Sequence, residues 1–545
     1  MPRLSSYLYP QKAPVATAPA ATLLLLRDGV HGLEVLMTRR SSTASFAPGV
    51  FVFPGGKIDQ QDQLDAQNPY LLDDDKALTQ EITAAKVAAI RESFEELGIA
   101  LVQDQNGQYI SAQALQPLSR HQAFRQQCLD RGWRLAITKV FHYLHWITDR
   151  DMPRRFDVPF FVALMPPHQE PVADEAEQFE PQWISPAQAL KRHQAGDFLM
   201  IYPTIKTLEH LAKFSQTNEV FEAIAAHQKP FFTSSPRGGF LAGVEQRYME
   251  HEAEFGELEL TSPDGQLVHQ LDWQSERPVA LLKNIQRLTA PNPGFMTGPG
   301  TNTYLVGQAS TGFIVVDPGP ADERHLEKII TACDANIKAI ICTHSHPDHS
   351  PGAFVLQKML PQKVLIWGLA SGEFSRADSR FMPDSEVQNG QVFELQDAAI
   401  KHSLQVIFTP GHASNHIALL LQEEAVLFSG DHILNGSTTV IDPPDGNMND
   451  YLNSLDVLAA LAEQGQIEFI LPAHGYAIGN ALQAIKGLKA HRLKREAKIV
   501  KVVQANPKGT MDEWVAKAYD DVPERVWPIA KRSLLAHLQR LEQVG

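Results

Sequence analysis

The spacing of hydrophobic positions predicts two kinds of element along the 545 residues. In residues 86–99, apolar side chains recur three and four positions apart, which predicts an amphipathic helix from about residue 76 to 97. Gly98 is placed to end this helix. After Pro278, helical patterns alternate with apolar runs such as FIVVD, IKAIICT, LQVIFT, AVLFSG and IEFILPA. This alternation predicts a layered α/β domain with functional residues at strand ends.

Changes of pattern along the chain predict several domains. Residues 1–20 are rich in Ala and Pro, and we expect a flexible N-terminus there. We expect a first domain over 21–215, a connector over 216–275 that is helical and then β-rich, and a second domain over 276–485. Short helical patterns predict a small helical module over 486–545. The predicted fold class is therefore multidomain, with α/β and α+β parts.

Composition and charge narrow the class of protein. A hydrophobic content of 43% with 20% charged residues excludes a mainly disordered chain. The formal net charge of −15 argues against a protein whose whole surface binds polyanions. Three cysteines form no disulfide framework, which indicates a reducing compartment. Since no segment approaches the ~20 apolar residues of a membrane span, we expect a cytoplasmic protein with no membrane partner and leave its oligomeric state open.

The C-terminal region differs in charge from the rest of the chain. From Lys486 onward there are thirteen Lys and Arg residues against seven Asp and Glu residues. A basic module on an acidic chain predicts a separate role for that module, although charge alone is weak evidence.

Three glutamates share one face of the first predicted helix. With steps of ~100° per residue, Glu95 and Glu96 lie within ~60° on either side of Glu92, opposite the apolar stripe. Oxygen ligands on one face suit Mg²⁺ or Mn²⁺, which neutralise a diphosphate and orient a water. Gly55 and Gly56 precede this helix and could let the backbone approach a phosphate. A solvated acidic helix is the alternative for this spacing alone.

The order of these residues resembles a known family. FPGGKID followed by RESFEELGI, residues 91–99, resembles the box of the Nudix family. The resemblance implies an α/β/α sandwich and hydrolysis of a small molecule in which a nucleoside diphosphate is linked to another group. It also implies that Glu92, Glu95 and Glu96 bind the metal and that Arg91 orients Glu95.

Two departures from the Nudix box leave its activity open. Thr83 stands eight positions before Arg91, where the box has a glutamate. In the family pattern the arginine follows the second glycine at a much shorter distance, whereas a long insertion separates Gly56 from Arg91 here. Such an insertion resembles the branch that contains the Nudix type 19 coenzyme A diphosphatases and implies substrates of the coenzyme A type. The alternative is a non-catalytic nucleotide sensor.

A second group of residues predicts a dinuclear metal site. One apolar strand leads directly into the motif HSHPDH at 344–349, and further ligand types follow at the ends of later strands. Imidazole and carboxylate groups at loop tips are suitable ligands for zinc, iron or manganese. Seven candidates are too many for one tetrahedral ion and fit two ions. The candidates are His344, His346, Asp348, His349, His412, Asp431 and His474.

This ligand order resembles the metallo-β-lactamase superfamily, which implies an αββα sandwich. The resemblance implies one zinc, iron or manganese ion on His344, His346 and His412, a second ion on Asp348, His349 and His474, and Asp431 as the bridge. Asp348 is also expected to steer a metal-activated hydroxide, which makes it a catalytic candidate. Asp317 is expected to support the site. His416 has two open interpretations, as a contact to a substrate oxygen or as a structural residue.

The substrate of this second site stays open between two classes. The stretch NPGFMTGPGTNTYLVG, the segment GDHILNGSTTVIDPPDG around Asp431 and the tail that begins HRLKREAKIV resemble the β-lactamase-like protein 2 family over residues 280–545. This resemblance implies cleavage of single-stranded RNA and a C-terminal winged-helix-like module. Its basic side chains would then contact phosphates, or they form an ordinary solvated helix face. The competing prediction is hydrolysis of a small ester, thioester or lactone. The basic residues are Lys486, Lys489, Arg492, Lys494, Arg495, Lys498 and Lys501.

Overall fold

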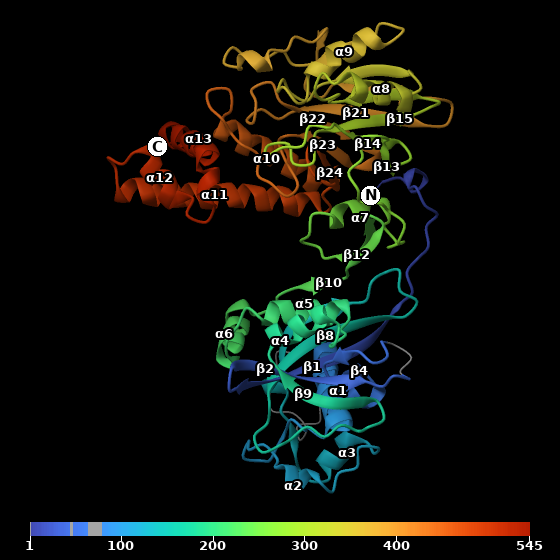
Figure 1. Ribbon diagram of the computed structural model, residues 1–545, viewed down its shortest axis with the longest axis vertical. Coiled ribbons are helices and arrows are strands. Elements are labelled where there is room, and N and C mark those ends of the chain that lie inside the picture. Colours follow the sequence, from blue (N-terminus) through green and yellow to red (C-terminus); the bar gives the residue numbers. More distant parts are fainter. Residues whose placement is uncertain (1, 44–46, 64–78, 545) are drawn as a thin grey trace. The chain divides into compact units, whose positions relative to one another are not determined.

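The computed structural model describes residues 2–43, 47–63 and 79–544, which form two compact units (Figure 1). The N-terminal unit is Ala13–Pro236, and the C-terminal unit is Arg237–Gly545 together with Met1–Lys12. The predicted connector is therefore divided between the units. Its first helix, α6 (Thr217–His227), belongs to the N-terminal unit, whereas its β-rich second half belongs to the C-terminal unit.

The N-terminal unit is built on a mixed eight-stranded sheet. The main strand order is β10-β7-β8-β1-β2-β3, with β4 paired to β1 and β9 paired to β2. The strands are β1 (Thr17–Gly29), β2 (Gly32–Arg40), β3 (Phe51–Val52), β4 (Gly55–Lys57), β7 (Phe141–Ile147), β8 (Arg155–Leu164), β9 (Gln178–Ile184) and β10 (Thr233–Ser234). A small antiparallel pair joins β5 (Val102–Gln103) to β6 (Arg134–Leu135).

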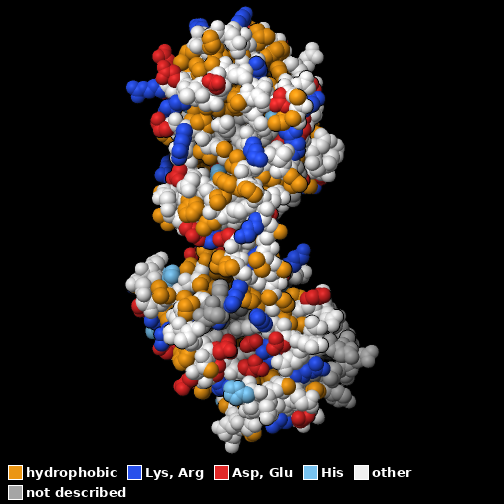
Figure 2. Space-filling model, turned by 90° about the vertical axis from the view of Figure 1, so that its right-hand side faces the viewer, with side chains coloured by type: hydrophobic (Ala, Val, Ile, Leu, Met, Phe, Trp, Pro, Cys, Tyr) orange, Lys and Arg blue, Asp and Glu red, His pale blue; other side chains and the backbone are white. Residues whose placement is uncertain are grey.

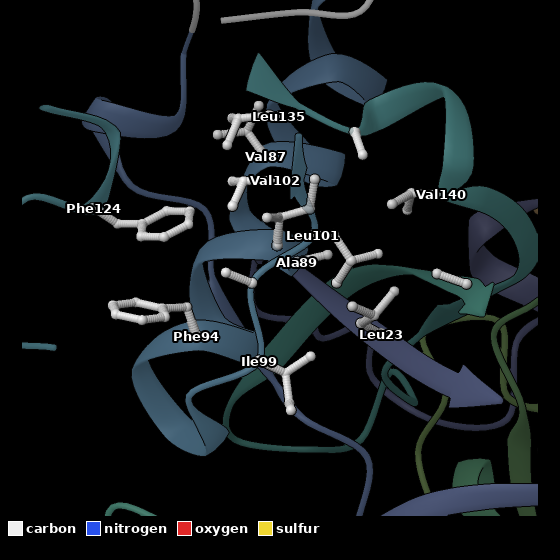
Figure 3. Close-up of a cluster of buried hydrophobic side chains, with 14 of the residues drawn as sticks. Leu23, Val87, Ala89, Phe94, Ile99, Leu101, Val102, Phe124, Leu135 and Val140 are labelled. Atoms are coloured by element: carbon white, nitrogen blue, oxygen red, sulfur yellow. The ribbon is translucent and has the colours of Figure 1, made fainter. Parts of the chain in front are cut away.

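Helix α1 (Gln80–Leu97) carries the predicted glutamates and buries the predicted apolar stripe. Thr79 caps its start, because its hydroxyl accepts a hydrogen bond from the Ile82 N–H. Gly98 ends it with a φ of 69°, a left-handed conformation that glycine adopts readily. The stripe packs with Leu23 of β1 and with the segments around β5 and β6 (Figure 3). The predicted residues 76–78 lie outside the described residues.

Short helices complete the N-terminal unit. Residues 212–216 separate the last two of these helices from one another. The remaining helices are α2 (Ala112–Leu115), α3 (Phe124–Leu129), α4 (Pro186–Ala195) and α5 (Tyr202–Leu211).

The C-terminal unit contains two sheets that share a buried core. The first has the order β13-β14-β15-β16-β17-β18-β19 and the second β20-β21-β22-β23-β24. The first consists of β13 (Val279–Leu282), β14 (Ile285–Thr289), β15 (Asn302–Gln308), β16 (Gly312–Val316), β17 (Ile337–Ile341), β18 (Ile366–Gly368) and β19 (Ser385–Glu386). The second consists of β20 (Val392–Gln396), β21 (Lys401–Phe408), β22 (Ile417–Leu421), β23 (Val426–Gly430) and β24 (Phe469–Pro472).

Helices cover both outer faces of this pair of sheets, so the layers are αββα (Figure 1). Helices α8 (Glu323–Ala332) and α9 (Pro351–Met359) pack on the first sheet. Helix α10 (Met448–Glu463) and the start of α11 (Ala481–Ala505) pack on the second. A hairpin of β11 (Arg237–Leu241) and β12 (Val244–Tyr248) and the short α7 (Phe255–Thr261) complete this part.

The first residues of the chain differ from the flexible segment that we expected. The Arg3 guanidinium pairs with Glu424 at 2.8 Å, and the Ser6 hydroxyl donates to the same carboxylate at 2.7 Å. Tyr7 is buried in the core between the two sheets. The Glu424 carboxylate is fully buried, so a partner with donors is required there, and the N-terminal segment supplies it.

In the C-terminal module the described residues 481–544 form helices joined by short loops and contain no strand. Helix α11 continues into α12 (Met511–Ala518) and α13 (Trp527–Val544), and these three share a small apolar core. Among the described residues, no helix is both long enough and apolar enough to cross a membrane.

Candidate metal-binding sites

The ends of four strands in the C-terminal unit bring the seven predicted ligands together. The motif at 344–349 follows β17, and His412 follows β21. Asp431 directly follows β23, and His474 lies two residues after β24. The backbone of each strand is fixed in a sheet, so its last side chains are aimed at one place.

The ligand atoms form groups that match the two predicted ion sites. The ligand atoms of His344, His346 and His412 lie within 4.8 Å of one another, and so do those of Asp348, His349 and His474. Within the first group, Nδ1 of His346 lies 3.0 Å from Nε2 of His344 and 3.0 Å from Nε2 of His412. Within the second, Oδ2 of Asp348 lies 3.3 Å from both partner Nε2 atoms.

Asp431 lies between the two groups, as the bridging role requires. Its Oδ2 atom is 3.7 Å from Nε2 of His412 in the first group. Its Oδ1 atom is 3.3 Å from Nε2 of His474 and 3.5 Å from Nε2 of His349 in the second. One carboxylate thus faces ligands of both groups with different oxygens.

Supporting hydrogen bonds fix the orientation of the histidine rings. Nδ1 of His412 donates to the carbonyl oxygen of Val440 at 2.8 Å, and Nδ1 of His474 donates to that of Gly300 at 3.1 Å. With the proton on Nδ1, the Nε2 lone pair of each ring is directed at the other ligands.

Asp317, which we expected to support the site, contacts the second group directly and the first group through Thr343. It accepts a hydrogen bond from Nδ1 of His349 at 3.0 Å. It also accepts the Thr343 N–H and hydroxyl, both at 2.7 Å, and that hydroxyl lies 3.0 Å from Nδ1 of His344. One buried carboxylate therefore orients a ligand in each group.

The residues present fit metal ions. Nε2 of His349 and Oδ1 of Asp431 are buried and have no hydrogen-bond partner among the described residues, and a cation between them would satisfy both. Burial lowers the pKa of His346 to about 3, so this ring is neutral, as a metal ligand must be. Nitrogen and carboxylate donors of this kind suit zinc, iron or manganese.

The position of His416 favours the structural one of its two predicted roles. The side chain is fully buried. Its Nδ1 lies 2.8 Å from the Thr409 hydroxyl, and its Nε2 accepts the backbone N–H of Asp431 at 3.2 Å. Both ring nitrogens are therefore engaged with protein groups. His416 holds the backbone at the bridging carboxylate, which is the structural alternative.

The candidate site of the N-terminal unit is organised around one buried arginine. Nη1 of Arg91 donates to Glu92 and to Glu95, each at 2.8 Å. Its Nε and Nη2 donate to the two oxygens of Asp62 at 2.8 and 2.9 Å. The predicted contact from Arg91 to Glu95 is thus present, and Glu92 shares it. Figure 2 shows acidic and basic side chains next to one another on this unit.

Glu96 is the most deeply placed of the three glutamates. It accepts hydrogen bonds from the Gly55 N–H at 3.1 Å and from the Gln178 amide at 2.9 Å. Burial raises the pKa of Glu96 to about 8 and that of Glu92 to about 7. A bound divalent cation would favour the charged forms of these carboxylates.

Gly55 and Gly56, which were expected to let the backbone approach a phosphate, are closely packed. Both belong to β4, which pairs with β1. A Cβ atom on Gly56 would lie 2.3 Å from Oε1 of Glu92, and one on Gly55 would lie 2.4 Å from the Ala21 carbonyl oxygen. The space left by the glycines is filled by a carboxylate and by a neighbouring strand. The glycines therefore allow close packing around the glutamates.

The N-terminal ligands are less closely grouped than those of the C-terminal unit. Among the described residues, Glu92, Glu95 and Glu96 form no group whose ligand atoms all lie within 4.8 Å of one another. Thr83 is on the first turn of α1, where its hydroxyl donates to the Thr79 carbonyl oxygen at 3.0 Å. The part of the insertion over residues 64–78 lies outside the described residues.

Sequence reasoning missed Asp62. This residue is 1% exposed and is the bidentate partner of Arg91. Thr83 stands eight residues before Arg91, but the insertion lies between the acidic position of the motif and this helix, so that spacing does not apply here. Counting forward from Gly56 instead places the acidic position six residues on, at Asp62. The Nudix acidic position is therefore filled by an aspartate, and the insertion lies after it.

The basic side chains of α11 are largely engaged within the unit. Lys486 pairs with Glu463 at 2.6 Å, and Arg495 pairs with Asp521 at 2.7 Å. Lys489 and Lys498 pair with Asp456 and Asp520. Arg492 is 5% exposed and donates to a backbone carbonyl oxygen. Carboxylates close to this helix thus offset much of its positive charge.

Known proteins resemble separate parts of this chain. The Beta-lactamase-like protein 2 homolog of Caenorhabditis elegans is 30% identical over 266 residues, which cover 48% of this chain and 85% of the relative. The chain belongs to the metallo-beta-lactamase superfamily. The family model of this superfamily matches residues 296–474, so the second predicted fold is confirmed.

Family models also match on both sides of the metallo-beta-lactamase domain. The NUDIX domain model matches residues 16–202, and the beta-lactamase associated winged helix domain model matches residues 510–545. These matches confirm the predicted fold class. Since the NUDIX and metallo-beta-lactamase families are hydrolases, the protein is a hydrolase.

Further similarities involve one domain at a time. The Atrochrysone carboxyl ACP thioesterase of Aspergillus chevalieri is 30% identical and covers 48% of this chain and 82% of its own. The crystal structure of a NUDIX hydrolase from Alicyclobacillus acidocaldarius is 27% identical, with a TM-score of 0.34, and covers 38% of this chain and 96% of its own. A metallo-beta-lactamase family protein from Thermus thermophilus is 22% identical, with a TM-score of 0.40, and covers 49% and 95%.

Proposed function

We propose that the metallo-beta-lactamase domain hydrolyses a small thioester or a related ester. The observation that carries this proposal is the engagement of the α11 basic side chains with carboxylates and a carbonyl oxygen of the same unit. A long polyanion needs cationic groups that can pair with its phosphates, and here most of this charge is already offset. A relative named as an acyl carrier protein thioesterase supports the same substrate class.

Each residue of this site has a role that follows from its contacts. Asp431 faces both ligand groups and would help to hold both ions. The Thr301 hydroxyl donates to Oδ2 of Asp348 at 3.3 Å and holds this carboxylate toward the second group. When bound, two divalent ions would supply an activated water near neutral pH. The side chain of Asp348 is 25% exposed, so its carboxylate is within reach of solvent and can accept a proton.

Thioester hydrolysis by the metal-loaded full chain tests this proposal. An acylated pantetheine thioester is incubated with the protein, and the released thiol is measured. We expect turnover that Asp348→Asn removes and that Asp450→Asn, an exposed aspartate of α10, leaves unchanged. Cleavage of labelled single-stranded RNA is measured beside it with the same variants. RNA cleavage that depends on Asp348, without thiol release, would replace the proposal by the RNA alternative.

We further propose that the NUDIX domain hydrolyses a nucleoside diphosphate derivative with Mg²⁺ or Mn²⁺. Arg91 orients Glu92 and Glu95, and Gly55 and Gln178 hold Glu96 beside them, so the three carboxylates of the motif are supported together. Asp62 is the acidic partner of Arg91, a role that Thr83 cannot fill. One argument for a non-catalytic sensor is therefore removed.

Magnesium-dependent turnover of a panel of diphosphates, coenzyme A included, tests this second proposal. We expect hydrolysis that the double substitution Glu95→Gln and Glu96→Gln abolishes. Tight binding of a diphosphate by the native chain without any turnover would instead support the nucleotide-sensor alternative.

A further inference from the structure

Two arginines of the C-terminal helices contact the loop that follows the bridging aspartate. This ligand loop, residues 432–446, connects Asp431 to the start of α10. Arg492 of α11 donates through Nη2 to the carbonyl oxygen of Thr439. Arg532 of α13 donates through Nη1 to Oδ2 of Asp442 at 3.2 Å. The loop is therefore attached to the helical module at two separate points.

The same part of the ligand loop contacts one metal ligand of the first group and the bridging ligand. The carbonyl oxygen of Val440 accepts the Nδ1 proton of His412 at 2.8 Å. The Thr439 hydroxyl donates to the carbonyl oxygen of Asp431. The position of residues 439 and 440 thus determines both the ring orientation of His412 and the backbone position of Asp431.

Arg492 is fixed in place by its surroundings. It is 5% exposed, and its guanidinium lies 5.1 Å from the centre of the Tyr451 ring. The Tyr451 hydroxyl donates to the carbonyl oxygen of His432, the first residue of the ligand loop, at 2.8 Å. Ile433 and Ile441 of this loop share a buried cluster with residues of α10, α11 and α13. Arg492 is therefore part of a packed contact and is not placed to bind a phosphate in solvent.

We propose that Arg492 is a positioning residue of the dinuclear site, acting through the ligand loop on His412 and Asp431. The C-terminal helical module is then a structural component of the metal site. This role is independent of which ester the site hydrolyses, because it concerns ion binding. It also gives the one buried basic residue among those predicted on α11 a function that RNA binding does not require.

Ion affinity measured on the full chain tests this role without reference to substrate. Arg492→Met removes the donor and keeps a long side chain, and zinc content and competition with a chelator are then measured. We expect one or both ions to bind about 10–100-fold more weakly, as for other supporting groups of metal ligands. The absorption spectrum of the cobalt-loaded chain is expected to change as well. Arg492→Lys, which keeps a charged donor, should restore part of the affinity.

Lys494→Met is the matched control, because Lys494 is exposed on the same helix. We expect its ion affinity and cobalt spectrum to equal those of the native chain. A folded Arg492→Met chain that binds both ions with native affinity would overturn the proposal.

If Arg492→Met does not fold, Arg532→Gln tests whether the C-terminal helices support ion binding. The Arg532 side chain is 40% exposed, so Arg532→Gln should keep the fold, which circular dichroism checks. We expect a severalfold loss of ion affinity, because the other attachment of the ligand loop is then removed. Native affinity in this variant would overturn the proposal in that case.

Discussion

In the metallo-beta-lactamase domain most metal ligands have supporting partners of their own, whereas in the NUDIX domain one arginine supports two of the three ligands. His412 and His474 donate to separate carbonyl oxygens, and His349 donates to Asp317. Arg91 instead binds both Glu92 and Glu95. The two sites therefore differ in how many contacts must fail before the ligands lose their orientation.

The chemistry of the ligands explains this difference. In the metallo-beta-lactamase site imidazoles lie next to carboxylates: against the effect of burial, Asp431 and Asp348 raise the pKa of His474 to about 10. Opposite charges from several strand ends therefore attract one another before an ion is bound. Carboxylates on one helix face repel one another, and a nearby cation such as Arg91 reduces that repulsion. The NUDIX site is thus expected to be more sensitive to a single substitution and to the presence of a divalent cation.

The largest effect is expected from Asp431→Asn. Its carboxylate faces both ligand groups, so both ions should bind more weakly. Because even supporting groups cost about 10–100-fold, we expect hydrolysis to fall by at least about 100-fold. Zinc per chain and the rate of thioester hydrolysis measure the effect, with Asp450→Asn as the control. Two bound ions and a native rate in Asp431→Asn would contradict the bridging role.

Arg91→Met is expected to destabilise the NUDIX domain strongly. The substitution leaves Asp62 buried without its cationic partner, and breaking such a buried pair costs about 3–5 kcal/mol in the free energy of unfolding. Urea unfolding of the N-terminal unit measures this cost.

The matched control for Arg91→Met is Arg134→Met, at an exposed position of β6. We expect this control to change the free energy of unfolding by less than about 0.5 kcal/mol. If Arg91→Met changes the free energy of unfolding equally little, Arg91 is not the shared support on which the NUDIX site depends.

A smaller effect is expected from Asp62→Asn. An asparagine keeps one acceptor for Arg91 but loses the charge, so Glu92 and Glu95 should be less well oriented. We expect diphosphate hydrolysis to fall by about 10-fold, the lower range for a supporting group. Asp59→Asn is the control, because the Asp59 carboxylate is 57% exposed and lies 4.0 Å from Arg91. Equal rates in the two variants would argue against a specific role for Asp62.

A separate effect, on stability alone, is a dependence of the unfolding temperature of the NUDIX domain on pH. The pKa of Glu96 is about 8 in the folded chain against 4.5 for an ordinary glutamate, because burial disfavours the charged form. The folded chain then holds a proton that the unfolded chain has released. This contribution to stability is full below pH 4.5 and is lost as pH rises through 8. Without divalent cations, the unfolding temperature of this domain should fall as pH rises from about 5 to about 8.

Magnesium and Glu96→Gln provide the two controls for this pH dependence. Mg²⁺ favours the charged carboxylate and should reverse the fall, by roughly 2–4 °C for each kcal/mol recovered. Glu96→Gln cannot titrate and should flatten the curve. An unfolding temperature that rises over the same range in cation-free buffer would contradict the raised pKa.

Much of the metallo-beta-lactamase site could be predicted from the sequence, because its ligands follow recognisable apolar strands. A strand that ends in HSHPDH, with later strands that end before His412, Asp431 and His474, places ligand types at one edge of a layered domain. The glutamates of the NUDIX domain could also be predicted, because the spacing of residues 91–99 places them on one helix face.

Hydrogen bonds between residues that lie far apart in the chain could be found only in the tertiary structure. Asp62 meets Arg91 from the other side of a long insertion, and Arg492 meets Thr439 from a separate helix. The sequence pattern of α11 is the same whether its basic side chains face solvent or neighbouring carboxylates.

The sequence by itself thus determined which residue types stand at strand ends and on helix faces, because these follow from the local periods of the backbone. The tertiary structure decided which of them are buried and paired. His416 shows the difference, since its place four residues after His412 left two roles open. Only its packing against Thr409 and the backbone of Asp431 favours the supporting role. Burial and hydrogen bonding depend on what the rest of the chain brings next to a residue.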